Sequence, residues 1–265
     1  MKMAITSVPT DGTDSVRLEP MRKFYKYPLS VWSWFTFGAL CLIFLPIVAI
    51  VFVVTRPFDK ARYWPGYTFR RIPYVHRLVN PHWKFNITGS FPANPRKPYV
   101  VVSNHQSFVD MLLLSQLPWE MKWMSKESLF KVPVAGWMMR MAGDIEIERG
   151  DARSALRALR ECQRKLEMKV SVMMFPEGTR SRSGELAEFK DGAFKLAIDA
   201  GVEVLPIVLN GTYNALTPNS WTFNKVRADL KVLAPIDTSS YSRREASLLR
   251  QHVQGVMAEE LAKMS

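Results

Sequence analysis

His105 and Asp110 are the residues of this chain whose types and spacing best suit proton transfer. A neutral imidazole can take a proton from an alcohol, and a carboxylate bonded to its other nitrogen fixes the tautomer and raises the basicity. On one continuous helix, side chains five residues apart point about 140° away from each other. The two groups can therefore meet only where a loop gives way to a helix.

A helix start between the two residues supplies that change. Residues 107–110 have the form Ser-x-x-Asp and precede the apolar run Met111–Leu114, which is typical of a helix N-terminus. With Ser107 as the N-cap, His105 lies in the preceding loop and Asp110 in the first turn, so the side chains come together. Serine at a helix start is more typical of a cap than of a covalent nucleophile. An ordinary capping box beside an incidental histidine is the alternative interpretation.

A second polar segment has the composition of an anion-binding turn. Residues 175–181 read Phe-Pro-Glu-Gly-Thr-Arg-Ser, and their proline and glycine favour a tight turn. Thr179, Arg180 and the backbone N–H groups of such a turn can donate to an anion, and Lys190 and Lys195 add positive charge nearby. A basic surface turn without a ligand is the alternative. The glycine-rich signatures of nucleotide-binding loops do not occur.

Both polar segments follow apolar runs that predict strands, and helical segments alternate with these strands. This alternation predicts an α/β domain, a mixed sheet flanked by helices. Loops at the carboxyl ends of strands are where open α/β sheets bind ligands. Strands are expected at 99–103, 144–149, 170–175, 202–209 and 226–233, and helices at 107–117, 152–167, 189–200 and 243–263.

The N-terminal part of the chain predicts membrane association. Residues 31–54 contain no charged side chain, and about 20 apolar residues are enough to cross a bilayer core. Lys and Arg flank both ends, so charge does not select an orientation. Pro46 permits a kink, and both a spanning and a re-entrant segment stay open. Residues 62–83 interleave aromatic and basic side chains, which is typical of the headgroup layer.

We therefore expect three regions: a mobile tail over residues 1–26, a membrane-embedded and interfacial helical region over 27–83, and an α/β domain over 84–265. With 36 Lys and Arg against 24 Asp and Glu, the formal net charge is +12. Such a charge favours an anionic partner, either nucleic acid, an acidic membrane or a phosphorylated substrate. Two cysteines without a CxxC motif argue against a disulfide framework and a structural zinc site.

Four blocks of sequence, in order, resemble the glycerolipid acyltransferases, specifically the 1-acylglycerol-3-phosphate acyltransferase branch. Residues 104–110, Asn-His-Gln-Ser-Phe-Val-Asp, are similar to the first block, and residues 175–180, Phe-Pro-Glu-Gly-Thr-Arg, to the third. The segment 126–149 is similar to the second block and 204–208 to the fourth. The resemblance covers roughly residues 85–235.

This resemblance implies transfer of a fatty acyl group from acyl-CoA or acyl-carrier protein to the free hydroxyl of 1-acylglycerol 3-phosphate, which gives phosphatidic acid. His105 would be the general base, Asp110 would orient it, and Lys126 is a candidate donor to the oxyanion. No metal and no cofactor beyond the acyl donor are implied. The residues implied to hold the acceptor are Arg149, Glu177, Gly178, Thr179 and Arg180.

The implied partners are membrane lipids and the acyl donor, without nucleic acid, and the oligomeric state stays open. The implied location is a membrane, with the catalytic domain on its cytoplasmic face, as in a bacterial inner membrane. One alternative is an acyltransferase for glycerol 3-phosphate, a lyso-ornithine lipid or another lysophospholipid. The other is a basic, membrane-tethered protein that binds lipid or nucleic acid without catalysis, which gives no reason for the ordered blocks.

Overall fold

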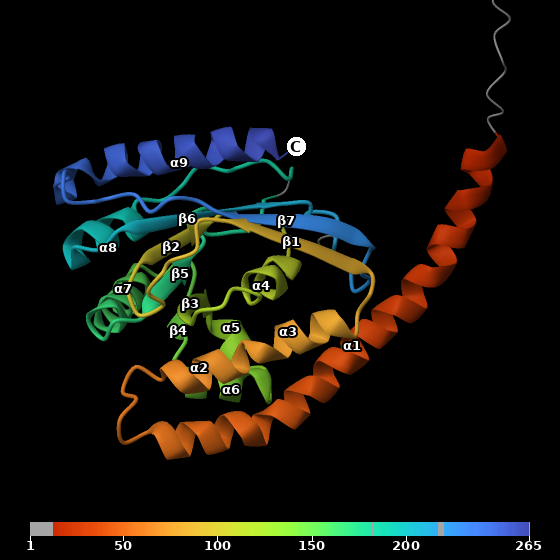
Figure 1. The fold of residues 1–265 in the computed structure, drawn as a ribbon, viewed down its shortest axis with the longest axis horizontal. Helices are drawn as coiled ribbons and strands as arrows, with labels where there is room; N and C mark the ends of the chain where they lie inside the picture. The colour runs from red at the N-terminus through yellow and green to blue at the C-terminus, as the bar shows by residue number, and fades with distance from the viewer. Residues whose placement is uncertain (1–12, 182, 217–219, 265) are drawn as a thin grey trace, which may run out of the picture.

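A seven-stranded mixed sheet forms the centre of the protein (Figure 1). This computed structural model describes residues 13–181, 183–216 and 220–264, with side chains from Tyr25 onward. The strand order is β1-β7-β6-β2-β5-β3-β4, and neighbours are parallel except for β6 and β7. The strands are β1 Trp83–Gly89, β2 Val100–Ser103, β3 Met121–Lys126, β4 Ile145–Ile147, β5 Ser171–Met174, β6 Val204–Asn210 and β7 Val226–Val232.

Helices cover both faces of this sheet. In Figure 1, α7, α8 and α9 lie on one side, while α4 lies on the other side with α1, α2, α3, α5 and α6 beyond it. The helices are α1 Thr13–Thr55, α2 Tyr63–Phe69, α3 Arg71–Leu78, α4 Val109–Leu114, α5 Glu127–Phe130, α6 Ala135–Ala142, α7 Ala152–Glu167, α8 Gly192–Ala200 and α9 Ala246–Lys263.

Strand β2 is buried on both faces, which explains its uninterrupted apolar run. Val100 and Val102 contribute to the core under α7, α8 and α9. Val101 points to the opposite core, where it meets Leu113 and Leu114 of the α4 helix. Side chains alternate along a strand, so a central strand between two helical layers is apolar at every position. The predicted mixed sheet flanked by helices is therefore confirmed, with β2 at its centre.

Two strands of the sheet were not predicted. β1 is an edge strand beside β7, and its apolar residues alternate with Lys84, Asn86 and Thr88. β3 contains Lys122, which interrupts the apolar pattern although the side chain is fully buried. The predicted helix at 107–117 is shorter in the structure, where α4 ends at Leu114.

The buried Lys122 ammonium is neutralised and fully hydrogen-bonded. Its Nζ donates to Glu120 Oε1 at 2.8 Å and to the backbone oxygens of Arg62 and Ala142 at 2.7 Å each. Gly66 of α2 packs so closely that a Cβ there would lie 2.0 Å from Glu120 Oε1. A buried charge needs an ion-pair partner and hydrogen bonds of this kind. Here the partners of Lys122 connect α2 and α6 to the sheet.

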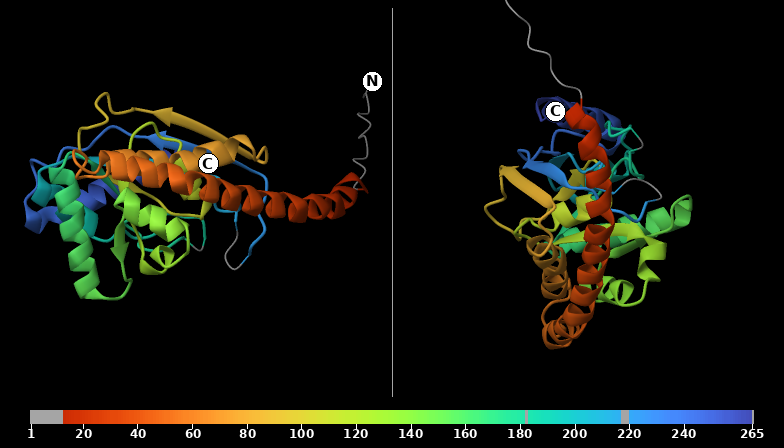
Figure 2. Two further views of the ribbon diagram at one scale, coloured as in Figure 1. Left: turned by 90° about the horizontal axis from the view of Figure 1, so that it is seen from below. Right: turned by 90° about the vertical axis from the view of Figure 1, so that its right-hand side faces the viewer.

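The later part of the long helix α1 lies against the domain, whereas its first turns extend away from it (Figure 2). Its inward residues include Ser30, Ser33, Cys41 and Val48, all buried, and it packs on α2, α3 and α6. Its segment Tyr25–Thr55 is long and apolar enough to cross a membrane by length and composition. The large apolar side chains on its exposed face are Val31, Trp32, Phe35, Leu42, Ile43, Ile47, Ile50, Val53 and Val54.

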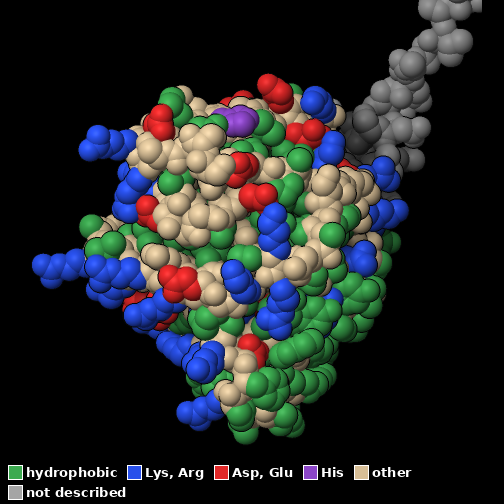
Figure 3. All heavy atoms as spheres, turned by 60° about the vertical axis from the view of Figure 1, so that its left-hand side comes forward, with side chains coloured by type: hydrophobic (Ala, Val, Ile, Leu, Met, Phe, Trp, Pro, Cys, Tyr) green, Lys and Arg blue, Asp and Glu red, His purple; other side chains and the backbone are tan. Residues whose placement is uncertain are grey.

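The surface divides into an apolar part and a basic part. In Figure 3, hydrophobic side chains gather along the lower and right-hand edge of the molecule, while Lys and Arg stand out over the rest of this face. The apolar edge includes the exposed side of α1. An apolar surface of this extent, bordered by cations, is typical of a membrane-binding face.

One expectation for the N-terminal region is wrong. Residues 13–26, expected in a mobile tail, are helical because α1 begins at Thr13, whereas residues 1–12 lie outside the described part of the chain. Residues 62–83, expected to be helical and interfacial, contain α2 and α3, which pack between α1 and the domain and bury Tyr63, Ile72 and His76. Their interfacial location stays a prediction. α1 also continues through Pro46 as a single helix.

Candidate active site

The predicted site residues share one edge of the sheet. His105 follows β2, Lys126 ends β3, Arg149 follows β4 and Glu177 follows β5. These four strands run parallel, so their carboxyl ends meet at the same edge. The topology therefore brings segments far apart in sequence to one place, as expected for an open α/β sheet.

His105 and Asp110 are in contact, as predicted. His105 Nδ1 lies 2.7 Å from Asp110 Oδ2, and both side chains are buried. The helix start that allows this contact differs slightly from the prediction. α4 begins at Val109 with Phe108 in the N-cap position, and Ser107 Oγ accepts from the Val109 N–H at 3.4 Å.

Asp110 Oδ2 also fixes the loop that carries the histidine. It accepts the backbone N–H groups of Gln106 at 2.6 Å and Ser107 at 2.8 Å, in addition to the ring nitrogen. Donors converging on one oxygen stabilise the ionised carboxylate. Because the carboxylate accepts at Nδ1, the proton sits on that nitrogen and leaves Nε2 to accept a proton from a substrate.

The turn after β5 holds His105 from the other side. Glu177 Oε1 accepts the His105 backbone N–H at 2.8 Å, and the Ser181 N–H donates to the His105 carbonyl oxygen at 2.7 Å. The Phe175 ring stacks on the imidazole with centroids 4.0 Å apart and planes 14° apart. Sequence reasoning missed the roles of Phe175 and Ser181, although they are the first and last residues of the predicted anion-binding turn.

Burial raises the pKa of the Glu177 carboxyl to about 7, and the nearby Asp110 charge acts in the same direction. The backbone N–H groups of His105 and Ala187 oppose this rise in pKa by donating to the carboxylate.

The next residue, Gly178, adopts φ +75°, and a Cβ at this position would lie 2.9 Å from Lys190 Nζ. Glycine is therefore favoured where the chain reverses.

Asn104 and Gln106 anchor the His105 loop to distant segments. The Asn104 amide donates to the Leu209 carbonyl oxygen and accepts the Leu209 N–H, both at 2.8 Å, as a strand residue would. Gln106 donates to the Gly184 carbonyl oxygen at 2.9 Å and accepts from Thr212 Oγ1 at 3.1 Å. Both roles were missed, although Asn104 lies in the first block.

Arg149 and Arg180 supply positive charge without a carboxylate partner. Both side chains are exposed, and neither takes part in an ion pair within the described ranges. Partial desolvation and the neighbouring Arg180 guanidinium lower the pKa of Arg149. Two guanidinium groups that approach each other in this way suit a phosphate, which accepts from planar donors. Thr179 is exposed beside them.

Lys126 lies on a strand two places away in the sheet from the strand that leads into His105. Its side chain is exposed at the end of β3, and β5 separates this strand from β2. No contact joins Lys126 to His105 within the part of the chain that the structure describes. Its expected role as an oxyanion donor stays a prediction.

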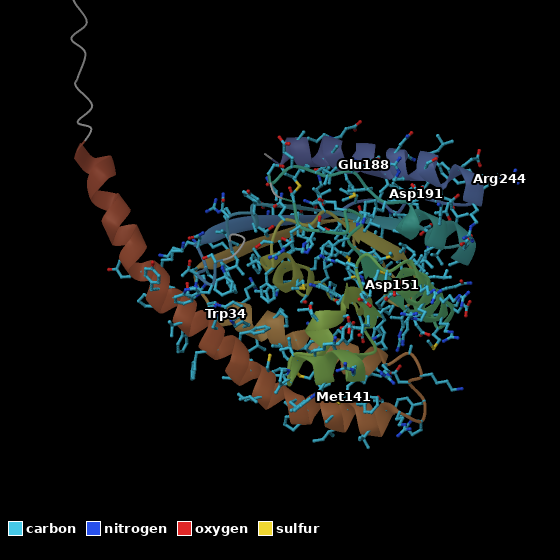
Figure 4. All side chains as sticks on the ribbon, turned by 180° about the vertical axis from the view of Figure 1, so that it is seen from behind. Trp34, Met141, Asp151, Glu188, Asp191 and Arg244 are labelled. Carbon is cyan, nitrogen blue, oxygen red and sulfur yellow. The ribbon has the colours of Figure 1, made fainter. Side chains whose placement is uncertain are left out.

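An aromatic cluster connects the catalytic loop to α1. Trp34, labelled in Figure 4, lies on α1 and donates from Nε1 to the Trp221 carbonyl oxygen at 2.8 Å. Its ring centroid lies 5.0 Å from that of Phe223 and 6.0 Å from that of Phe108. Phe108 follows Ser107 directly, so the apolar helix contacts the loop that carries the base.

Comparison with known proteins agrees with this geometry. Residues 84–210 match the family model described as Acyltransferase. The 1-acyl-sn-glycerol-3-phosphate acyltransferase of Chlamydomonas reinhardtii is 37% identical over 79% of this chain and 62% of its own length. That of Haemophilus influenzae is 32% identical over 62% of this chain and 69% of its own length.

The fold has a solved counterpart as well. The crystal structure of PlsC, the 1-acyl-sn-glycerophosphate acyltransferase of Thermotoga maritima, matches with a TM-score of 0.78 and 28% identity, covering 92% of this chain and 97% of that one. The chain spans 38%, 62% and 50% of the lengths of relatives from Arabidopsis thaliana, Chlamydomonas reinhardtii and Brassica napus. With the ordered motifs and the matching fold, the chain belongs to the 1-acyl-sn-glycerol-3-phosphate acyltransferase family.

Proposed function

We propose that this protein transfers a fatty acyl group from an acyl thioester to the free hydroxyl of 1-acylglycerol 3-phosphate, giving phosphatidic acid. The observation that carries the proposal is the His105–Asp110 pair, joined at 2.7 Å and positioned at the carboxyl edge of the sheet. The names of the relatives support the choice of acceptor.

In the proposed mechanism, His105 Nε2 takes the proton of the acceptor hydroxyl as its oxygen attacks the thioester carbonyl carbon. A carbon–oxygen bond forms, and the carbonyl oxygen becomes an oxyanion. The intermediate then collapses, the carbon–sulfur bond breaks, and the leaving thiolate takes the proton from the imidazolium. Asp110 stays ionised throughout and stabilises the imidazolium through Nδ1. Lys126 stays a candidate for the oxyanion, together with backbone N–H groups.

The exposed guanidinium groups of Arg149 and Arg180 support a phosphate-bearing acceptor. Both lack a carboxylate partner among the described residues, so both can bind a phosphate without first breaking an ion pair. Arg180 belongs to the turn whose Glu177 contacts the base, which links the headgroup site to the reacting hydroxyl. Acyl-CoA and acyl-carrier protein are both acidic donors, and the net charge of +12 favours either one.

The exposed apolar face of α1 supports a membrane location for the reaction. Because the opposite face packs along α2, α3 and α6, we propose that α1 is embedded alongside the domain. The contact of Trp34 with Phe108 then holds the active site at the membrane surface, where acceptor and product reside. The proposed location is the cytoplasmic face, as in a bacterial inner membrane.

A product assay with the full-length protein tests this proposal. Each of four acceptors, 1-acylglycerol 3-phosphate, glycerol 3-phosphate, a lyso-ornithine lipid and lysophosphatidylcholine, is combined with acyl-CoA or acyl-carrier protein. Mass spectrometry of the lipids is expected to show phosphatidic acid as the fastest product. Faster acylation of another acceptor would replace the proposed acceptor, and no acylation of any would remove the enzymatic function.

The same assay with His105→Ala tests the mechanism. Loss of general base catalysis is expected to lower kcat by about 10²–10⁴-fold, while the melting temperature and vesicle binding are preserved. His252→Ala is the matched control, because this histidine lies on α9 and its ring is hydrogen-bonded to Tyr241. Substantial activity in His105→Ala would exclude His105 as the base.

A further inference from the structure

We infer that Glu177 is a positioning residue for the catalytic base, which holds the backbone of His105 and does not bind the acceptor lipid. This inference rests on the proposed function, because it gives Glu177 a different part in the same reaction. The sequence resemblance places Glu177 among the residues that hold the acceptor, so the structure assigns it a new role.

The Glu177 carboxylate is already used on both oxygens. Oε1 accepts the His105 N–H at 2.8 Å, and Oε2 accepts the Ala187 N–H at 3.4 Å. The residue is only 6% exposed. An acceptor hydroxyl would therefore have to displace a backbone donor inside the protein to reach this carboxylate.

Residues 175–181 support the backbone and the ring face of His105 and leave its Nε2 atom for the substrate. Glu177 binds the N–H of His105, Ser181 binds its carbonyl oxygen, and Phe175 stacks on its ring. With Asp110 on Nδ1, the backbone on both sides of the Cα and the plane of the imidazole are fixed. Nε2 alone is left for chemistry, and its direction depends on these supports.

The same turn points its remaining side chains the other way. Thr179 and Arg180 are exposed, whereas Glu177 and Ser181 are buried. Gly178 lies between them with φ +75°, where the chain reverses. The turn thus places two inward residues on the base and two outward residues at the surface where an anionic headgroup would bind.

The ionisation of Glu177 agrees with a buried role. Its pKa is raised to about 7 by burial, with Asp110 adding to the rise. Lys190 is the cation that approaches the turn, at Gly178. A protonated carboxyl offers one acceptor oxygen fewer, so protonation weakens the support of His105 or Ala187.

Steady-state kinetics with matched variants separate positioning from acceptor binding. Glu177→Ala is expected to lower kcat by about 100-fold, because small displacements of a catalytic group cost this much. Glu177→Gln retains one acceptor oxygen and is expected to recover part of the lost kcat. In both variants, the KM for 1-acylglycerol 3-phosphate is expected to stay within about two-fold of the parent, since the acceptor contacts are intact. Arg180→Gln, from the same turn, is expected to raise KM instead. A raised KM with unchanged kcat in Glu177→Gln would overturn the inference.

A spectroscopic readout tests the inference without any substrate. In detergent micelles, the Nδ1 proton of His105 bonded to Asp110 is expected as a downfield proton resonance, assigned by its absence in His105→Gln. Glu177→Gln is expected to shift or broaden this resonance, whereas Arg180→Gln leaves it unchanged. An unchanged resonance in Glu177→Gln would contradict the positioning role. Should the parent protein fail to acylate 1-acylglycerol 3-phosphate, the proposed function would fall while this comparison still decides the role of Glu177.

Discussion

The His105 loop and the Arg149–Arg180 surface differ in how completely their groups are bonded. The loop is buried, and its side chains and backbone groups are engaged by neighbours in the turn after β5 and on β6. The two arginines are exposed and lack carboxylate partners among the described residues. Groups that react need a fixed geometry before the substrate arrives. Groups that bind a charged headgroup need hydrogen-bond donors that the protein does not already use. We therefore expect the buried loop to set kcat and the two arginines to set KM.

Among the variants that keep His105, the largest expected effect comes from Asp110→Asn, which tests the buried loop in this comparison. The amide cannot accept three donors as the carboxylate does, and it disfavours the required imidazole tautomer. We expect kcat to fall by about 10³–10⁴-fold. The measurement is phosphatidic acid formation under saturating acceptor, with Asp237→Asn as the exposed control. Near-normal activity would show that the carboxylate does not support the base.

The double variant Arg149→Ala with Arg180→Ala tests the exposed arginine surface. Loss of charge-assisted hydrogen bonds to the phosphate is expected to raise the KM for 1-acylglycerol 3-phosphate by about 10–100-fold, with a smaller change in kcat. Lysophosphatidylcholine, with its zwitterionic headgroup, serves as the comparison acceptor. Arg227→Ala with Arg244→Ala removes the same charge elsewhere; Arg244, labelled in Figure 4, lies directly before α9. An equal rise in KM from the control pair would point to general electrostatics.

Phe175→Leu sharpens the comparison with a smaller change. Leucine keeps an apolar contact but loses the stacking at 4.0 Å that orients the imidazole. An aromatic pair of this kind contributes about 0.5–1.5 kcal/mol, so we expect kcat to fall by about 2–10-fold with KM unchanged. Initial rates over a range of acceptor concentrations measure both constants. A change confined to KM would place Phe175 against the acceptor.

The smallest expected effect is on stability against pH. The folded-state pKa of Glu177, about 7, lies above the ordinary value of 4.5, so the folded protein binds more protons between these values. Stability should therefore fall as pH rises from about 5 to about 7.5, and level off above. In Glu177→Gln, this component of the slope of melting temperature against pH should disappear. Glu188→Gln, an exposed control, should leave it in place; an unchanged slope in Glu177→Gln would contradict the raised pKa.

Local patterns predicted the catalytic pair but not its supports. His105, Asp110 and the helix start between them lie within a few residues of each other, so their contact could be predicted from the local sequence. Asn104 is bonded to Leu209 and Gln106 to Thr212, more than 100 residues later. Such partners are set by the packing of β2 against β6, which a local pattern does not contain.

The turn at 175–181 shows the same limit in another form. Its composition predicts a tight, anion-binding turn, but not which side chains face inward. That direction depends on the strand before it and on Gly178, where the chain reverses. The strand β3 was missed for a related reason, since the buried Lys122 looks like a surface residue until its partners are known. The sequence motifs were sufficient to predict the contact between His105 and Asp110, and the topology was needed for the orientation of the turn.

The hydrogen bonds of Lys122 have a consequence for the order in which the protein can fold. Two of its acceptors belong to the segment before α2 and to α6, so the ammonium loses water only when both have docked. Until then the ammonium has its bond to Glu120 but lacks the two bonds to backbone oxygens, which makes a half-assembled domain unfavourable. The burial of Lys122 thus couples the docking of α2 and α6 to the completion of the sheet.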